Sequence, residues 1–493
     1  MRAPALSALV VAGLGACGRP APGSARWKSM LPAELASLDP RFATRSYDVK
    51  TTRLIHAGLV GLDPDTLAPV PRAAKSWRFL DERTLELELR DGVRFHDGKP
   101  LVVEDVCATL AAIKDPALGS PHRPVAKSIA SCEGAGGGRL VLRLAEARAT
   151  LLTDLEVPIL EEREARSAPH PLGDLNGLGP YRVLTATPSA VELVPADTGL
   201  VAKPRHALTV RSIRDENARA LRLLAGRADI APNAMSPTLL PSLDGSHGLS
   251  VRARPGANVS YLLFQNDHPP FDRPEVRRAV SRVLDRELVV RTLLGGRAQV
   301  ASGLLPPGHW AKADESAAVA ESRETAERVL RGLPPVTLST STDRLRVIIA
   351  RALAQMLRDA GLDVRVISLD FGVFMARLDA GDFEMATLQM PELTEPNLLA
   401  WFFHPRGIPG AGSEGKNRAR YRDAEVGSWL DAAGATRDLD ERRRLYGLVE
   451  RRMQRDLPVI PLWHEDQVAV VSERARSFDL SAEGRWWKVA TLP

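Results

Sequence analysis

The sequence predicts an α/β protein with two or three domains. At 493 residues the chain exceeds the usual size of a single hydrophobic core. Apolar residues recur at helical spacing from Asp343 to Ala360, and the stretch from Leu362 to Ile367 then alternates as a strand does. Gly361 between them suits the end of a helix. Helix-to-strand units of this kind favour α/β domains.

The clearest strand pattern runs from Thr84 to Arg90, where leucines alternate with charged residues. Two turn dipeptides, Asp91-Gly92 and Asp97-Gly98, follow it. A helix is predicted from Asp105 to Ile113, because its apolar residues again have helical spacing. An earlier helix is predicted from Thr52 to Leu62.

Further elements follow along the chain. Arg139 to Leu144 alternates as a strand, and Asp215 to Arg227 has helical spacing. Val276 to Leu288 carries one continuous apolar helical face, and Arg442 to Leu457 is a last amphipathic helix. The alternation of helices and strands therefore extends over most of the chain.

The composition is typical of a globular protein, with 44% hydrophobic and 26% charged residues and a net charge of +5. The basic residues are scattered and form no stripe of the kind that nucleic-acid binders carry. No apolar span of 18 residues exists beyond the N-terminus, so no transmembrane helix is expected in the mature protein. Sequence motifs of zinc hydrolases, serine hydrolases and nucleotide-binding loops are absent, and the ten histidines show no ligand spacing. We therefore expect no metal, no cofactor and no catalytic centre.

The first 23 residues predict a signal peptide followed by a lipoprotein tether. Met1-Arg2 is a short positive region, and Ala5 to Gly15 is apolar. Leu14 to Cys17 resembles a bacterial lipobox, which implies that Cys17 becomes a lipidated N-terminus. An ordinary secretory signal or a wrongly assigned start is the alternative.

Cys107 and Cys132 are the other two cysteines. In an oxidising compartment such a pair suits a disulfide. The sequence leaves two readings open, a disulfide or two buried free thiols.

The stretch from Ala73 to Pro116 carries a family resemblance. Its residues are similar to the signature of the family 5 extracellular solute-binding proteins, the dipeptide- and oligopeptide-binding components of ABC importers. The residues that carry the resemblance are Ala74, Trp77, Leu87, Leu89, Arg90, Gly92, Val93, Phe95, His96, Asp97, Gly98, Leu101, Glu104, Asp105 and Val106. Similar matches recur at Leu38-Asp39-Pro40, Gly177 to Tyr181, Tyr261 to Trp310 and Leu457 to His464. The resemblance covers roughly Leu31 to Val471.

The resemblance implies an α/β, two-lobed periplasmic-binding-protein fold of class II with an additional small inserted domain. Lobe 1 is then expected to be discontinuous, and the inserted domain interrupts it. The expected segments are 1–23 for the signal peptide and tether, 24–50, 174–255 and 468–493 for lobe 1, 51–173 for the inserted domain, and 256–467 for lobe 2.

The resemblance also implies where a ligand would bind. In dipeptide and oligopeptide binders an Asp holds the ligand ammonium, and the matching position here is Glu392. Arg346, or its neighbour Arg344, lies near the position of an Arg that binds the ligand carboxylate, a group that suits the guanidinium fork. The alternatives are that Glu392 and Glu395 are solvated loop acids and that both arginines lie at a solvated helix N-terminus.

Three further residues are candidates for the wall of the cleft: Asn266, Tyr47 and Trp401. Trp401 is equally compatible with a place in the core.

The expected function is that of a lipid-anchored, monomeric binding protein on a bacterial membrane, in the periplasm or at the cell surface. It would capture a peptide-like ligand by hinge closure and deliver it to the permease subunits of an ABC importer. Rival cargoes are a nickel chelate, an opine or a sugar. Less favoured rivals are a secreted hydrolase that uses the cleft carboxylates, and a sensor that reports ligand to a regulator.

Overall fold

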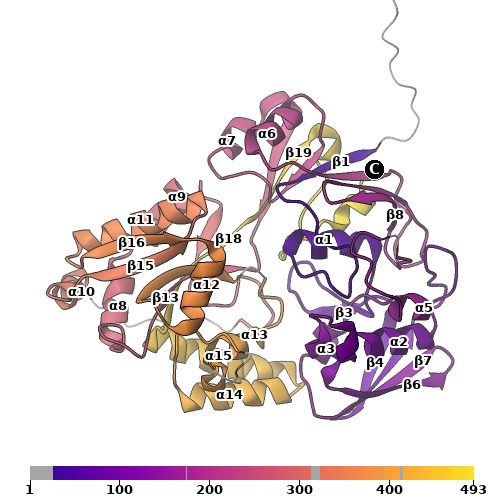
Figure 1. Ribbon diagram of the computed structural model, residues 1–493, viewed down its shortest axis with the longest axis horizontal. Coiled ribbons are helices and arrows are strands. Elements are labelled where there is room, and N and C mark those ends of the chain that lie inside the picture. Colours follow the sequence, from indigo (N-terminus) through magenta and orange to yellow (C-terminus); the bar gives the residue numbers. More distant parts are fainter. Residues whose placement is uncertain (1–25, 174, 313–321, 391, 411–412, 414) are drawn as a thin grey trace, which may run out of the picture.

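A computed structural model describes residues 26–173, 175–312, 322–390, 392–410, 413 and 415–493. These residues form two large lobes and a smaller domain, each built around a sheet of its own (Figure 1). In Figure 1 lobe 2 stands on one side, and lobe 1 lies above the small domain on the other. The predicted residue boundaries between these bodies stay predictions.

Lobe 1 is organised around a seven-stranded sheet with the order β12-β19-β11-β1-β10-β9-β8. Strand β1 pairs in parallel with β10 and β11, whereas the other pairs in this sheet are antiparallel. The strands are β1 (Trp27–Leu31), β8 (Tyr181–Thr187), β9 (Ala190–Pro195), β10 (Leu208–Ser212), β11 (Ile230–Pro232), β12 (Leu249–Arg254) and β19 (Gln467–Ser472). This one sheet therefore joins residues that are more than 400 positions apart in the sequence.

Helices α1 (Ser46–Ile55), α6 (Glu216–Leu224) and α7 (Leu240–Leu243) accompany this sheet. Two hydrophobic clusters occupy its faces. One gathers residues such as Trp27, Leu31 and Phe478, and the other gathers Met30 with residues of α6 and α7. The alternation of β1 side chains between the two clusters is the ordinary period of a strand.

Lobe 2 is organised around a six-stranded sheet with the order β14-β18-β13-β17-β15-β16. Its strands are β13 (Val259–Phe264), β14 (Ala298–Val300), β15 (Val336–Ser341), β16 (Val364–Leu369), β17 (Met385–Met390) and β18 (Val459–Glu465). Every residue of β13 is buried, because hydrophobic clusters lie on both faces of the sheet. A strand covered on both faces is expected to be continuously apolar rather than alternating.

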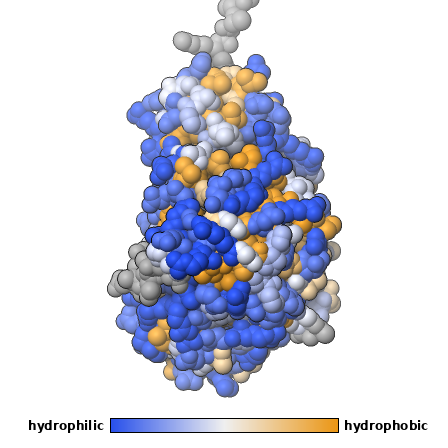
Figure 2. All heavy atoms as spheres, turned by 90° about the vertical axis from the view of Figure 1, so that its left-hand side faces the viewer, coloured by the Kyte–Doolittle hydropathy of each residue, from blue (hydrophilic) through white to orange (hydrophobic). Residues whose placement is uncertain are grey.

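Eight helices of lobe 2 carry these two clusters. They are α8 (Pro274–Val283), α9 (Arg286–Thr292), α10 (Arg323–Leu330), α11 (Arg344–Asp359), α12 (Phe371–Ala380), α13 (Leu398–Phe403), α14 (Ala424–Ala435) and α15 (Leu439–Asp456). Residues of α8 to α11 pack in one cluster, and residues of α12 to α15 pack in the other. On the side of α10 and α11 the surface is mainly hydrophilic, with smaller hydrophobic patches between (Figure 2).

The small domain has an antiparallel four-stranded sheet with the order β4-β5-β7-β6. Its strands are β4 (Ala74–Asp81), β5 (Thr84–Leu89), β6 (Ile129–Gly136) and β7 (Arg139–Leu144). Helices α2 (Val103–Lys114), α3 (Arg123–Lys127), α4 (Leu151–Asp154) and α5 (Glu162–Ala165) accompany it, and β2 (Val60–Leu62) pairs with β3 (Pro69–Pro71).

Most predicted elements are confirmed with small shifts at their ends. Strand β5 buries Leu85, Leu87 and Leu89, as its alternation predicts. Helices α2, α6, α11 and α15 and strands β7 and β16 also lie at the predicted places.

Two predicted helices are wrong in extent. The helix expected from Thr52 to Leu62 is α1, which begins at Ser46 and ends at Ile55. Gly58 then packs so closely on the backbone of Glu156 that a Cβ would lie 2.5 Å from its carbonyl oxygen, and the chain continues as β2. The continuous face from Val276 to Leu288 is divided between α8 and α9, because the Asp285 side chain caps the start of α9.

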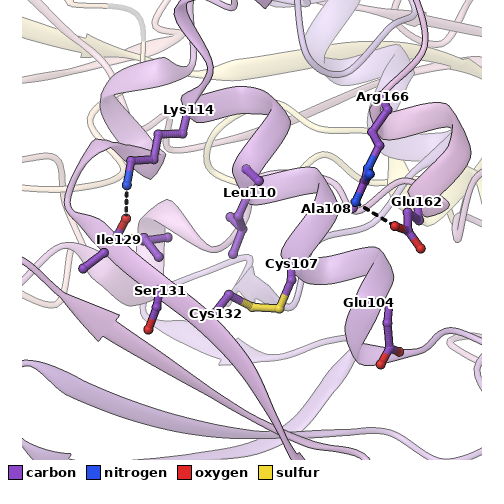
Figure 3. A pocket seen from close by; sticks show the side chains of 12 residues that line it. Glu104, Cys107, Ala108, Leu110, Lys114, Ile129, Ser131, Cys132, Glu162 and Arg166 are labelled. Carbon is purple, nitrogen blue, oxygen red and sulfur yellow. Dashed lines mark hydrogen bonds and ion pairs between the residues drawn. A yellow bond between two sulfur atoms is a disulfide. The ribbon is translucent and has the colours of Figure 1, made fainter.

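Cys107 of α2 and Cys132 of β6 form a disulfide in the structure. Figure 3 shows the bond between the helix and the strand, beside a surface pocket. The disulfide fastens α2 to the edge strand of the small domain. Among the described residues, no helix has the length and apolar character needed to cross a membrane.

Removal of this disulfide is expected to destabilise the small domain. The bond closes a loop with a sequence separation of 25 residues, and loops of this size correspond to a loss of about 3 kcal/mol when the cross-link is removed. The double variant Cys107→Ala/Cys132→Ala is the clean test, because it leaves no free thiol. Urea unfolding compares it with the oxidised chain. An unchanged free energy of unfolding would contradict the prediction.

Three buried histidines make the fold sensitive to acid. Burial lowers the pKa of His56 to about 3 and the pKa values of His309 and His464 to about 4. The unfolded chain takes up these protons at pH values below about 6.5, whereas the folded chain does not. The free energy of unfolding should therefore fall by about 2 kcal/mol per histidine between pH 7 and pH 5.

Urea titrations at the two pH values measure this fall. His464→Gln should reduce the pH dependence, since a glutamine takes up no proton. His247→Gln is the matched control, because His247 is exposed. Equal pH dependence in both variants would contradict the assignment.

Candidate functional site

Two short segments carry the chain between the lobes. One joins β12 to β13, and the other joins β18 to β19 through Asp466. The Asn258 side chain connects them: its Nδ2 donates to the Glu465 carbonyl at 2.6 Å, and its Oδ1 accepts from the Glu465 backbone N–H at 2.8 Å. Short paired segments of this kind are where hinge motion between lobes takes place.

The Asn233 side chain lies beside the second crossing on the side of lobe 1. Its Nδ2 donates to Gln467 Oε1 at 2.6 Å, and its Oδ1 accepts from the Val468 backbone N–H at 2.8 Å. Tyr47 of α1 donates its hydroxyl to the Asn233 carbonyl at 2.8 Å, and burial raises the pKa of this phenol to about 12. Tyr47 thus contacts the hinge region through its hydroxyl.

The predicted ligand residue Glu392 follows β17 of lobe 2 and faces α1 of lobe 1. Its Oε1 lies 3.5 Å from the Ser46 hydroxyl and 3.7 Å from the Lys50 Nζ. Ser46 and Lys50 are four residues apart, so they lie on the same face of the helix. The Glu392 side chain is 26% exposed and that of Lys50 is 7% exposed. The carboxylate is therefore placed where the two lobes meet.

A chain of buried charges continues from this point into lobe 1. Arg53, one turn after Lys50, lies 3.4 Å from the Glu156 carboxylate. Arg485 donates to the same carboxylate at 3.0 Å and lies 3.3 Å from Glu483. Carboxylates and cations are therefore interspersed from lobe 2 to the C-terminal segment, with two cations, Lys50 and Arg53, next to each other on α1.

The pKa values of these charged groups depend on two opposing effects, burial and the pairing of opposite charges. Burial lowers the pKa of Lys50 and outweighs the attraction of Glu392. Burial opposes ionisation of Glu156, but Arg485 and Arg53 outweigh it and bring its pKa below the usual range. Burial raises the pKa of Glu483 in spite of Arg485. Arg53 Nε and Glu483 Oε2 are buried and have no hydrogen-bond partner among the described residues. Buried groups of this kind are ordinarily satisfied by water or a ligand.

Glu395, three residues after Glu392, is buried and touches the small domain. Thr153 of α4 donates its hydroxyl to Glu395 Oε2 at 2.9 Å, and Arg442 of α15 forms an ion pair with the other oxygen. Burial raises the pKa of Glu395 against the effect of Arg442. The reading of Glu395 as a solvated loop acid is therefore wrong. Its loop contacts lobe 1 through Glu392 and the small domain through Glu395.

Arg346, the predicted partner of a ligand carboxylate, is already paired. It lies in the first turn of α11 and donates to Glu465 Oε1 at 2.6 Å and to Gln389 Oε1 at 3.2 Å. Glu465 outweighs burial and raises the pKa of Arg346. A ligand carboxylate at this place would have to compete with Glu465. Arg344 is exposed at the start of the same helix.

The two remaining candidates do not come together with Glu392 through any described contact. Asn266 donates to the carbonyls of Phe264, Ala419 and Pro458. Trp401 of α13 is 44% exposed and packs edge-on against Phe402. Their part in ligand binding stays a prediction.

Sequence reasoning missed Lys50, Arg53, Glu156 and Arg485. Lys50 and Arg53 are three residues apart, but the other members are separated by about a hundred residues or more, so no local sequence pattern predicts the cluster. The spacing of Ser46, Lys50 and Arg53 on one helical face is the only local signal. Within the described residues, no group of three or more His, Cys, Asp or Glu side chains is suited to hold a metal ion.

Comparisons with known proteins give the same fold. The dipeptide-binding protein of Pseudomonas aeruginosa is 24% identical over 506 residues, which cover 93% of each chain. The structure of NikZ from Campylobacter jejuni in complex with Ni(L-His) has a TM-score of 0.78 at 21% identity and covers 94% of this chain and 98% of its own. The oligopeptide-binding protein AppA from Bacillus subtilis, in complex with a nonapeptide, has a TM-score of 0.75 at 18% identity, with coverage of 94% and 98%. These likenesses confirm the two-lobed periplasmic-binding-protein fold.

A match to a family model identifies the protein family. The model described as bacterial extracellular solute-binding proteins, family 5 Middle, matches residues 68–410. This range contains the whole signature stretch and most of lobe 2. The chain therefore belongs to the bacterial extracellular solute-binding proteins of family 5.

Proposed function

We propose that this chain is the substrate-binding lipoprotein of an ABC importer, and that it captures a peptide-like ligand between its lobes and delivers it to the permease. The observation that carries the proposal is the place of Glu392. Its carboxylate comes from lobe 2, points at α1 of lobe 1, and lies 3.7 Å from a buried lysine. The curated relatives include dipeptide- and di/tripeptide-binding proteins, which supports a peptide cargo.

A peptide ammonium would take the place of Lys50 at Glu392. Both groups are cations, and a carboxylate that is shielded from water binds a cation strongly. The backbone of the ligand would pair with strand edges or side-chain amides at the junction, which gives affinity with little dependence on side chains. Once the ammonium has displaced Lys50 from Glu392, the lysine can form an ion pair with the ligand carboxylate. This exchange suits a zwitterionic ligand.

Binding without chemical change is the expected activity. Glu392 faces Lys50 and Ser46, and Glu395 is occupied by Arg442 and Thr153. A glycosidase-like or protease-like use of two carboxylates would need one of them free to exchange a proton with the substrate, whereas in the proposed complex Glu392 pairs with the ligand ammonium and Glu395 stays paired with Arg442. The family consists of solute-binding proteins, which agrees with this view.

The proposed location is a bacterial membrane surface, in the periplasm or on the cell exterior, with the protein attached through Cys17. The signal peptide, the lipobox and Cys17 lie outside the described residues. The protein would act as a monomer that delivers ligand to the permease.

Glu392→Gln is expected to weaken the binding of peptides with a free N-terminus. Loss of a charge-assisted hydrogen bond corresponds to about a 10- to 100-fold rise in Kd. Calorimetry with a dipeptide or tripeptide found by thermal-shift screening measures this change. The matched control is Glu287→Gln, because Glu287 is 76% exposed on α9.

N-acetylated peptides sharpen this test. They lack the ammonium, so they should bind the unmodified protein weakly, and Glu392→Gln should weaken them no further. An equal loss for free and acetylated peptides would show that Glu392 does not contact the ammonium.

The rival cargoes are tested in the same thermal-shift assay. Nickel-histidine chelates, opines and sugars should leave the melting temperature unchanged, whereas short peptides should raise it. Nickel merits inclusion because the related structures from Campylobacter jejuni and Staphylococcus aureus hold nickel-histidine complexes. A shift caused by one of these compounds and by no peptide would overturn the peptide assignment. Mass spectrometry of the recovered ligand should find it intact, and cleavage products would favour the hydrolase.

A further inference from the structure

A basic hollow lies on lobe 1, away from the junction of the lobes. It has a volume of about 370 Å³ and is bordered by β1, β9, β10 and α6. In Figure 1, α6 and β1 stand at the top of the molecule, at the end of lobe 1 that is farthest from the small domain. The charged residues that line the hollow are Arg26, Lys28, Glu192, Arg211, Arg222 and Arg227.

The hollow has an excess of positive charge. Its one carboxylate, Glu192, is paired with Arg26 at 2.9 Å. In the part of the chain that the structure describes, the side chains of Lys28, Arg211, Arg222 and Arg227 have no ion-pair partner, and all four residues are exposed. Like charges gathered in one concavity repel one another, and they raise the local affinity for anions.

The fold itself gathers these cations. In the parallel pair β1 and β10, Lys28 lies opposite Thr209, and Met30 lies opposite Arg211. Lys28 and Arg211 therefore share one face of the sheet, two positions apart. Arg222 comes from the last turn of α6, and Gly226, with φ of +64°, turns the chain before Arg227. The long side chains of these lysine and arginine residues thus line one hollow, some from the sheet and some from the end of α6.

The N-terminal segment, which lies next to the hollow in the sequence, contains no acidic residue that could pair with these cations. The first acidic residue in the sequence is Glu34, so residues 1–25 carry no carboxylate. An external anion is the chemically complementary occupant. Arginine and lysine together favour phosphate oxygens, which accept several hydrogen bonds at once.

We propose that this hollow docks on the phosphate headgroups of anionic phospholipids at the membrane surface. The position favours lipid: Arg26 is nine residues after Cys17, the predicted attachment site, and the eight residues between them span about 28 Å at full extension. Leu221, 65% exposed on α6 beside Arg222, offers an apolar side chain at the same surface. The proposal rests on the predicted lipid attachment within the proposed function.

Such a contact would add a second attachment to the lipid anchor. A basic surface adds electrostatic attraction to anionic lipids to the hold of an acyl anchor. Binding through the hollow would also present lobe 1, rather than lobe 2, to the membrane. The orientation of the protein beside its permease would then be restricted.

Vesicle flotation of the chain from residue 18 onward tests the proposal. This chain lacks Cys17, and it keeps every described sheet and core cluster. It should bind vesicles of phosphatidylglycerol and phosphatidylcholine, release them as salt is raised, and leave pure phosphatidylcholine vesicles unbound. Each neutralised cation should lower the partition coefficient about fivefold, so Arg222→Gln/Arg227→Gln should lower it roughly 25-fold.

The control variant is Arg351→Gln/Arg365→Gln, which makes the same change in net charge on exposed residues of lobe 2. It should change the partition coefficient less than twofold. Equal losses in the two variants, equal binding to uncharged vesicles, or stabilisation by inorganic phosphate without vesicle binding would each overturn the proposal. Peptide affinity measured on the same variants should be unchanged, so failure of the membrane contact and failure of the peptide assignment are seen separately.

Discussion

The buried carboxylate of Glu156 is the contact on which the arrangement of the bodies depends. It follows α4 of the small domain, and it binds Arg53 of α1 and Arg485 of the C-terminal segment. Three stretches of the sequence that are far apart are thereby fixed at one point. A buried carboxylate stays charged only when cations surround it, and removal of one partner would leave the other charges uncompensated. The cluster accordingly ties the small domain to lobe 1.

This arrangement brings the candidate site to the end of a charged network. Glu392 of lobe 2 extends the charged network through Lys50, and Glu395 of the same loop reaches the small domain through Thr153. Movement of lobe 2 about the two crossing segments would therefore separate Glu392 from α1 and Glu395 from α4. The loop that carries Glu392 and Glu395 would therefore lose both contacts in the same movement. In the proposed function, ligand binding and closure would be coupled through these few side chains.

The fold could be predicted from the sequence to a large extent, because the patterns that indicate its helices and strands each lie within a short stretch of sequence. The leucine alternation of β5, the apolar face of α11 and the signature around Gly92 and Gly98 are each contained in a few residues. The site could be predicted only in part. The position of Glu392 follows from family resemblance, whereas its partner Lys50 lies on a helix whose limits were misplaced. The pairing of Arg346 with Glu465 joins residues 119 positions apart, which no local pattern can reveal.

The place of β19 in lobe 1 has a consequence for biogenesis. This strand, at residues 467–472, lies between β12 and β11 and pairs with both. The sheet that starts with β1 near the N-terminus cannot be completed until almost the last residues of the chain have been made. The sheets of the small domain and of lobe 2 do not include β19, so all their strands are made before it. The domain whose first strand is made earliest is thus the one whose sheet is completed last.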